Sequence, residues 1–338
     1  MYNPEIFASG VYGVLKAHWK LRCETPLAIR NGKSIFYQTG DEKSKKTRGM
    51  QVRFAWKQPP PGSGTEHTVA ALHYGYQVRD GKLEQMHFVP PSSVRGSLRA
   101  WTINHLVRPD YRSKMSPPRK EKEAETEAYL NNLRQALADD DSGYHWIASL
   151  FGLALETRLE EENLSNAGRL RIETTPFTNA KAQPISVNGV LEDGLAGPGN
   201  ARRQMTVRNP LDRITHASKE GGLHHFLEFS RGETFNVCFT VLNPQGSDLG
   251  LFSLWRREID DGMLRLGALS SIGRGRVSIT EQSYQLWMNP NIQKLDWLES
   301  FETAENLVPG DALADLWTAY QLAPDVLDSF VSYLQEKA

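Results

Sequence analysis

The sequence has 338 residues and a formal net charge of −1, with 39% hydrophobic and 23% charged residues. This composition is typical of a globular protein with a buried core and excludes a disordered chain. No apolar run approaches the roughly 18 residues of a membrane-spanning helix, and Met1–Lys20 lacks the pattern of a secretory signal, so we expect a cytoplasmic protein without a membrane partner. Cys23 and Cys238 are too few and too far apart for a disulfide framework or a cysteine-based zinc site.

Charge is segregated along the chain although the total is close to zero. Residues 89–119 contain six basic residues and one acidic residue, 195–219 contain five and one, and 262–279 contain three and none. Residues 120–163 contain eleven acidic and four basic residues, and 281–338 contain ten and two. Because local potential sets the affinity for a phosphate backbone, this division suits a nucleic-acid partner. Ordinary solvated faces would give the same pattern.

Residue patterning in the first part of the chain predicts a strand, a long loop and a helix. Val14–Ala28 shows partial apolar alternation, which predicts the strand. The segment 31–68 is polar and includes the run Pro59–Gly64, so we expect a long loop or insertion there. Apolar residues at helical spacing predict a helix over Val94–Val107, with Ser92 or Ser93 as its N-cap.

The second part of the chain predicts a second strand, helix and strand series. In order, we expect helices over Glu121–Ala138 and Tyr144–Leu155, a strand over Gly168–Pro176, a loop or hairpin arm over 182–217, a strand over Thr234–Leu242, a helix over Leu249–Asp260, a strand over Arg276–Thr280 and a helical tail from Asn291. A strand, helix, strand order seen twice predicts an α+β fold of the ferredoxin-like kind, with insertions.

The segment Phe88–Trp101 is the first candidate site for a phosphate. Two prolines give an extended entry, and free N–H groups in the first helical turn can meet an anion. Arg95 and Arg99 are four residues apart and therefore share one helix face, from which they can clasp a phosphodiester. A capped helix with two arginines is also a common structural feature.

The segment Leu266–Val277 is the second candidate. Gly273 and Gly275 permit close backbone approach and a positive φ, and they alternate with Arg274 and Arg276. The segment lacks the lysine of a Walker loop and the spacing of a dinucleotide-binding loop. A nucleic-acid backbone and a plain glycine turn are equally compatible with it.

The segment Asn209–His225 is the third candidate. Asp212 and Arg213 can form a local ion pair, and the histidines of this segment can stack on bases or lie on the surface. His224 and His225 point in opposite directions in an extended chain, and a third metal ligand is missing. We therefore predict no metal site here.

Taken together, these segments resemble the RAMP superfamily of CRISPR-associated proteins, in particular the backbone subunits of type III effector complexes. The resemblance spans Leu15–Ile279 and rests on five ordered motifs. These are Thr25-Pro26-Leu27; Pro91-Ser92-Ser93 with Arg95-Gly96 and Arg99; Phe151-Gly152 with Gly168-Arg169-Leu170; Asp212-Arg213-Ile214-Thr215; and Leu266-Gly267 through Gly273-Arg274-Gly275-Arg276.

The resemblance implies an RRM-like, ferredoxin-like core over 1–280 with an insertion at about 31–68 and a protruding thumb hairpin at about 185–215. It implies CRISPR guide RNA, complementary target RNA and other effector subunits as partners. The acidic helical extension 281–338 lies outside it. The expected RNA-binding residues are Ser92, Ser93, Arg95, Arg99, Arg202, Arg203, Arg208, Arg213, Gly273, Arg274, Gly275 and Arg276.

The resemblance leaves the catalytic role open. Subunits of this family that cut target RNA carry an aspartate in the loop before the proline-serine-serine motif, and the corresponding position here is Tyr74. Asp41 and Asp80 are the candidate replacements, and solvated loop acids are the simpler interpretation of both. Mg²⁺ is expected as a cofactor only if the protein cleaves RNA, and otherwise no cofactor is expected.

Two alternatives to a guide-holding backbone subunit stay open. One is an endoribonuclease that processes CRISPR transcripts by acid–base chemistry, for which His18 or His73 would be needed. The full-length agreement with backbone motifs argues against it. The other is a subunit that caps the complex through protein contacts with little RNA contact, which the acidic tail favours.

Overall fold

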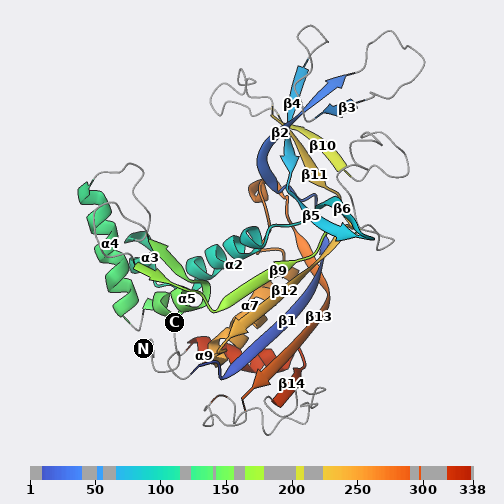
Figure 1. The fold of residues 1–338 in the computed structure, drawn as a ribbon. Coiled ribbons are helices and arrows are strands. Elements are labelled where there is room, and N and C mark those ends of the chain that lie inside the picture. Colours follow the sequence, from blue (N-terminus) through green and yellow to red (C-terminus); the bar gives the residue numbers. More distant parts are fainter. Residues whose placement is uncertain are drawn as a thin grey trace.

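The structure is a computed structural model and describes residues 10–39, 52–55, 66–114, 123–139, 142–155, 164–178, 203–208, 224–289, 297 and 318–335. Its core is a five-stranded antiparallel sheet in the order β14-β13-β1-β12-β9, which we call the central sheet (Figure 1). Within the described residues, no helix combines the length and apolarity needed to cross a bilayer.

The central sheet has the ferredoxin-like topology predicted from the sequence. The chain passes through β1 (Gly13–Cys23), α2 (Pro91–Leu106), β9 (Leu170–Thr174), β12 (Thr234–Leu242), α7 (Gly246–Asp260) and β13 (Val277–Met288). The four strands of these two β-α-β units lie in the order β13-β1-β12-β9, so each unit leaves a gap that a strand of the other unit fills. The predicted fold class is confirmed.

Alternating side chains of β1 build the core between the sheet and its helices. Leu15, Ala17, Trp19 and Leu21 are each at most 2% exposed. The Trp19 ring lies 5.8 Å from the ring of Phe252 on α7, in an edge-to-face arrangement. The period-two pattern seen in the sequence therefore marks the helix-covered face of the sheet.

Helices α2 and α7 are joined by hydrogen bonds as well as by apolar contacts. Trp255 Nε1 donates to Thr102 Oγ1 over 3.0 Å in the core, and Trp101 Nε1 donates to Glu258 Oε2 over 3.2 Å nearer the surface. Since a buried indole N–H needs an acceptor, these contacts fix how the two helices lie on the sheet.

A second five-stranded sheet, in the order β10-β11-β4-β2-β3, projects from one end of the central sheet (Figure 1). Its strands are β2 (Arg30–Thr39), β3 (Val52–Ala55), β4 (Glu66–Leu72), β10 (Arg203–Arg208) and β11 (His224–Phe229). The prediction of a long loop over 31–68 is wrong where β2, β3 and β4 form. These strands are held by ladder hydrogen bonds between segments far apart in the sequence, and their own composition gives little sign of them.

The remaining elements lie around these two sheets. They are the hairpin of β5 (Tyr74–Arg79) and β6 (Lys82–His87), the helices α3 (Pro109–Lys114), α4 (Glu123–Ala138) and α5 (Tyr144–Phe151), and the short pair β7 (Leu153–Leu155) and β8 (Leu164–Asn166). Helix α5 ends four residues earlier than predicted because Gly152 adopts a φ of 78° and leaves the helix.

The segment after residue 280 is part of the fold rather than a separate extension. Strand β13 runs to Met288, across the expected boundary, and β14 (Thr318–Leu322) pairs with it. The chain then continues through η3 (Val326–Phe330) and α9 (Val331–Gln335), which pack against α7. The described part of the tail thus contains an edge strand besides helical turns, and the predicted boundary at 280 is misplaced.

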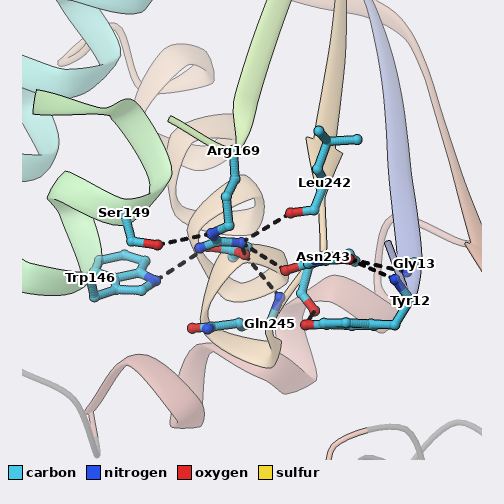
Figure 2. A network of polar contacts seen from close by, with 10 residues as sticks. Tyr12, Gly13, Trp146, Ser149, Arg169, Leu242, Asn243 and Gln245 are labelled. Carbon is cyan, nitrogen blue, oxygen red and sulfur yellow. Dashed lines mark hydrogen bonds and ion pairs between the residues drawn. The ribbon is translucent and has the colours of Figure 1, made fainter. Parts of the chain in front are cut away.

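A buried ion pair ties the other end of the central sheet to α5 and α7 (Figure 2). Arg169 Nη1 lies 2.6 Å from Asp248 Oδ2, and both side chains are almost fully buried. Arg169 also donates from Nε to Ser149 Oγ and from Nη1 to the carbonyl oxygen of Asn243. Trp146 Nε1 and the Gln245 N–H donate to the Asp248 carboxylate. The pair satisfies the bonding needs of two buried charges, and we call it the arginine clamp.

Two motifs that carried the family resemblance meet beside the arginine clamp. A Cβ at Gly168 would lie 2.5 Å from the carbonyl carbon of Phe151, so this position has no space for a side chain. The Arg169 N–H donates to the carbonyl oxygen of Ser149 over 3.1 Å. The phenylalanine-glycine and glycine-arginine-leucine motifs therefore act together as a structural joint between α5 and β9.

Candidate nucleic-acid interface

The two sheets meet at the end of β1, in a region that we call the sheet junction. It consists of Thr25–Ile29, the loop Gly262–Arg276 and the end of β11 at Phe229. Leu27 and Phe229 exchange backbone hydrogen bonds of 3.1 and 2.8 Å, and the Ala268 N–H donates to the carbonyl oxygen of Ala28 over 2.9 Å. The threonine-proline-leucine motif and the glycine-rich motif are thus in direct contact.

The glycine-rich loop is held against β1 by glycines with positive φ, as the sequence predicts. Gly267, Gly273 and Gly275 have φ of 75°, 85° and 77°. A Cβ at Gly275 would lie 2.0 Å from the carbonyl oxygen of Leu266, whereas a Cβ at Gly273 would meet nothing within 4 Å. Gly275 is therefore needed for packing, and Gly273 presents backbone to open space.

Arg274 and Arg276 of this loop have different environments. Arg274 Nε lies 2.8 Å from Oε1 of Glu228, a β11 side chain with no exposed area. The Arg276 side chain is exposed, and its backbone N–H donates to Thr25 Oγ1 over 3.0 Å. Arg274 thus neutralises a buried carboxylate, whereas Arg276 keeps its charge at the surface.

Helix α2 starts at the same end of the central sheet, at Pro91, which is three residues before the predicted start at Val94. Its N-cap is Pro90, so the prediction of Ser92 or Ser93 as N-cap is wrong. Pro91 occupies the first helical position, where its fixed φ suits the helix and its missing N–H costs nothing. The Ser93 and Val94 N–H groups both donate to the Pro90 carbonyl oxygen. Fewer N–H groups are therefore free for an anion than the sequence indicated.

Arg95 and Arg99 lie against other helices. Arg95 Nη2 donates to the carbonyl oxygen of Phe151 at the C-terminus of α5, where a positive charge is favourable. Burial lowers the pKa of Arg95, and repulsion from Arg99 lowers it further. Arg99 is half-buried, and its Nε has no hydrogen-bond acceptor among the described residues. Arg95 therefore has a structural partner that the sequence did not reveal.

The hairpin β5–β6 carries one of the two candidate carboxylates. Arg79 pairs with Lys82, so Asp80 and Gly81 form a two-residue turn with φ of 49° and 74°. These values fit a type I′ turn, in which Asp-Gly is a preferred pair. Asp80 is exposed at the hairpin tip, and its presence is explained by the turn. Tyr74 starts β5, opposite His87.

The described residues offer no metal centre. No three His, Cys, Asp or Glu side chains among them lie close enough to hold a metal ion. Asp41 lies outside the described residues. The expectation of Mg²⁺ stays a prediction that depends on RNA cleavage.

Of the segment 185–215, predicted as a thumb, the structure describes only β10. Arg203 and Arg208 are the first and last residues of β10, which pairs with β11 to form a hairpin. Arg202 and Arg213 lie outside the described residues, as does most of 185–215. The histidines of the processing alternative lie on separate elements: His18 faces Cys238 across β1 and β12, and His73 precedes β5. Burial lowers the pKa of His73.

Sequence reasoning missed Glu228 and the role of Arg169. The available signal for Glu228 was a charge between the apolar neighbours Leu227 and Phe229 in a short strand, which predicts a buried ion pair rather than an exposed side chain. The partner Arg274 lies 46 residues later, and nothing local identifies it.

The match to a family model agrees with the fold. A family model of the RAMP superfamily matches residues 20–278, most of the chain. Among solved structures, a chain of a "Type IV-B CRISPR Complex" matches with 14% sequence identity and a TM-score of 0.40, covering 86% of this chain and 100% of that one. The comparison with curated proteins gave no match.

Proposed function

The chain belongs to the RAMP superfamily, and from that premise we propose that it is a guide-RNA-binding subunit of a CRISPR effector ribonucleoprotein. The guide backbone lies along the sheet junction, where it leaves bases free to pair with complementary target RNA. Other effector subunits are its protein partners. The ordered motifs resemble those of type III backbone subunits, so we propose that the ribonucleoprotein is of that type.

The observation that carries this proposal is the exposed face of the glycine-rich loop. Gly273 presents open backbone, and Arg276 presents an exposed guanidinium three residues later. An open glycine in the same loop as an exposed arginine is suited to a phosphodiester, because the glycine permits close approach and the guanidinium can donate to the phosphate oxygens. The N–H groups of Gly273, Gly275 and Arg276 already donate within the protein, so the side chain of Arg276 is the expected donor. Ser92, at the entrance of α2, is also exposed at this end of the central sheet.

The contacts that hold this loop also support a binding role. The Gly275 N–H donates to the carbonyl oxygen of Pro26 over 3.0 Å, and the Leu266 N–H donates to the carbonyl oxygen of Gly275 over 2.9 Å. Together with the Arg274–Glu228 pair, these bonds fix the loop before any ligand arrives. A preorganised loop loses little conformational entropy on binding.

A binding titration with charge-matched variants tests the proposal. We would titrate labelled single-stranded RNA with the full chain at several salt concentrations, and compare wild type with Arg276→Ala and Arg134→Ala. Arg134 lies on α4, on the far side of the molecule from the sheet junction (Figure 1). We expect Arg276→Ala to weaken binding several-fold and to lower the salt slope by about 0.7, the value for one phosphate contact on a single strand.

Arg134→Ala should leave both the dissociation constant and the salt slope unchanged. If the two variants lose the same affinity, RNA binding is a non-specific charge effect and the proposal is wrong. RNA cleavage is not included in the proposal, because Asp80 is accounted for by the hairpin turn. Cleavage is tested by incubating the assembled ribonucleoprotein with target RNA and Mg²⁺. The comparison is between wild type, Asp41→Ala and Asp80→Ala.

A further inference from the structure

The β5–β6 hairpin exposes a strip of apolar side chains. Tyr76, Val78 and Leu83 are 62%, 68% and 68% exposed. Tyr76 and Val78 are two residues apart on β5, and Leu83 is the cross-strand partner of Val78, so the three side chains share one face. The Tyr74 ring lies 6.2 Å from the Tyr76 ring in an edge-to-face arrangement, which extends the strip toward the hairpin base. We call these four residues the tyrosine strip.

The opposite face of the hairpin is anchored to the protein. A Cβ at Gly75 would lie 2.1 Å from the Phe88 ring, and Met86 is only 2% exposed. At the hairpin base, on the same face as its cross-strand partner Tyr74, the His87 ring lies 5.6 Å from the ring of Phe229, and its Nδ1 is 3.0 Å from the carbonyl oxygen of His73. A two-stranded hairpin is marginally stable alone. These contacts hold its base in place and direct the tyrosine strip outward.

The hairpin is also continuous with the sheet junction. The His73 N–H donates to the carbonyl oxygen of Ile29 over 2.9 Å, and Ile29 follows the residue that pairs with Ala268 of the glycine-rich loop. At its other end, β6 leads through Phe88 and Val89 directly into α2. The tyrosine strip thus extends from the region where Arg276 and Ser92 are exposed.

The chemistry of the tyrosine strip favours nucleobases over a protein partner. Three exposed side chains cover far less than the ~800 Å² per partner that a specific protein interface buries. Flat aromatic rings accept bases of any sequence by stacking, and neighbouring aliphatic side chains can contact base faces.

We propose that the tyrosine strip is a stacking platform for unpaired bases of the RNA held at the sheet junction, with Tyr76 as its main contact. This inference rests on the proposed function. It adds a second element to RNA binding, since the sheet junction holds the backbone and the hairpin holds bases. Stacking does not distinguish one base from another, so the platform contributes affinity without sequence preference.

The test compares a variant that lacks the ring with one that keeps it. The full chain is titrated with two labelled single-stranded RNAs of equal length, one complete and one in which abasic sites replace the bases. We expect Tyr76→Ala to weaken binding of the complete RNA by about 5- to 150-fold, the range for one stacked base. Tyr76→Phe should stay within about twofold of wild type, and the abasic RNA should bind both variants as it binds wild type.

Other outcomes overturn the inference in distinguishable ways. If wild type binds the complete RNA but Tyr76→Ala binds it equally well, the platform is wrong while the proposed function stands. If Tyr76→Ala lowers affinity for both RNAs equally, its effect is not stacking, and the inference also fails. If wild type binds neither RNA, the proposed function fails too. Wild type could also self-associate through the strip. If the double variant Val78→Ser with Leu83→Ser abolishes that self-association and leaves RNA binding unchanged, the strip is a protein contact.

Discussion

The two ends of the central sheet use arginine in opposite ways. At one end, Arg169 is buried, and Asp248, Ser149 and backbone carbonyls occupy its guanidinium. At the other end, Arg276 is exposed, and its guanidinium has only a long contact of 3.5 Å with the carbonyl oxygen of Asp260. Both arginines belong to motifs that carry the family resemblance. The comparison teaches that an arginine in a family motif can either stabilise the fold or be available to a ligand, and that the burial of its side chain distinguishes the two roles.

Arg274 and Arg95 are intermediate between these two cases. Each lies in a motif that the sequence assigned to RNA, and each has an intramolecular partner, Glu228 or the carbonyl oxygen of Phe151. The structure therefore divides the predicted phosphate contacts into residues that shape the sheet junction and residues that stay available at its surface.

The largest expected effect is a loss of stability on substitution in the arginine clamp. Arg169→Ala leaves the Asp248 carboxylate buried without its counter-charge, and we expect a loss of about 3–5 kcal/mol in the free energy of unfolding. Urea denaturation followed by circular dichroism measures this loss. The double variant Arg169→Met with Asp248→Leu should lose less, because it removes both charges. A loss below about 1 kcal/mol for Arg169→Ala would show that the clamp is not the structural element described above.

Gly273 and Gly275 form a matched pair of positions for a test at the opposite end of the central sheet. Gly275→Ala brings a Cβ into the Leu266 carbonyl oxygen at positive φ, whereas Gly273→Ala meets only the cost of the φ. We expect Gly273→Ala to lose about 1 kcal/mol and Gly275→Ala at least 2 kcal/mol more. Thermal denaturation ranks the two variants. Equal losses would mean that the loop adjusts, and that it is not held as rigidly as the close contact indicates.

The variants Arg274→Ala and Arg276→Ala compare a structural arginine with a proposed phosphate contact. Arg274→Ala leaves Glu228 buried without its ion-pair partner and should lower the free energy of unfolding by about 2 kcal/mol. Arg276→Ala should leave stability unchanged and weaken RNA binding. Chemical denaturation and RNA titration of both variants provide the comparison. If Arg274→Ala weakens RNA binding without loss of stability, its assignment to the fold is wrong.

The smallest expected effect is a pH dependence at the sheet junction. The hydrogen bond from Ser278 lowers the pKa of Glu24 from 4.5, and the neighbouring Arg22 and Arg231 also lower it. A depressed carboxyl pKa contributes stability above 4.5 that is lost as the pH falls through the folded-state value. Because the partner Arg22 is half exposed and solvent screens the pair, we expect Glu24→Gln to reduce the acid sensitivity of the melting temperature only slightly. Melting curves between pH 6 and pH 3, with Asp80→Asn as a control, measure the difference.

The central sheet was largely predictable because its signals are local. The strand over Thr234–Leu242 is found with the bounds expected, and the apolar spacing of Val94 and Leu98 marks the buried face of α2. The second sheet was not predictable in the same way. Strand β2 pairs with β3 and β4, and β4 pairs with β11 more than 150 residues further along the chain. Strands that depend on such distant partners show little alternation of their own.

The motifs of the candidate site were predictable from the sequence, but the role of each arginine in them was not. Spacing placed Arg95 and Arg99 on one helix face, and composition identified the glycine-rich loop. Which arginine is occupied depends on Glu228 and on the end of α5, both of which are distant in sequence. The tyrosine strip was missed because Val78 and Leu83 gather on one face only when Asp80 and Gly81 turn the chain.

The contact at Gly250 has a consequence for how this protein can be divided or recombined. A Cβ on this α7 residue would lie 2.3 Å from the Phe330 carbonyl oxygen, so the helix and the C-terminal segment touch backbone to backbone. A change in the position of either backbone therefore requires a matching change in the other. Chimeras that exchange the C-terminal segment between family members should therefore fold only when α7 is exchanged with it, which makes these two segments one unit of inheritance.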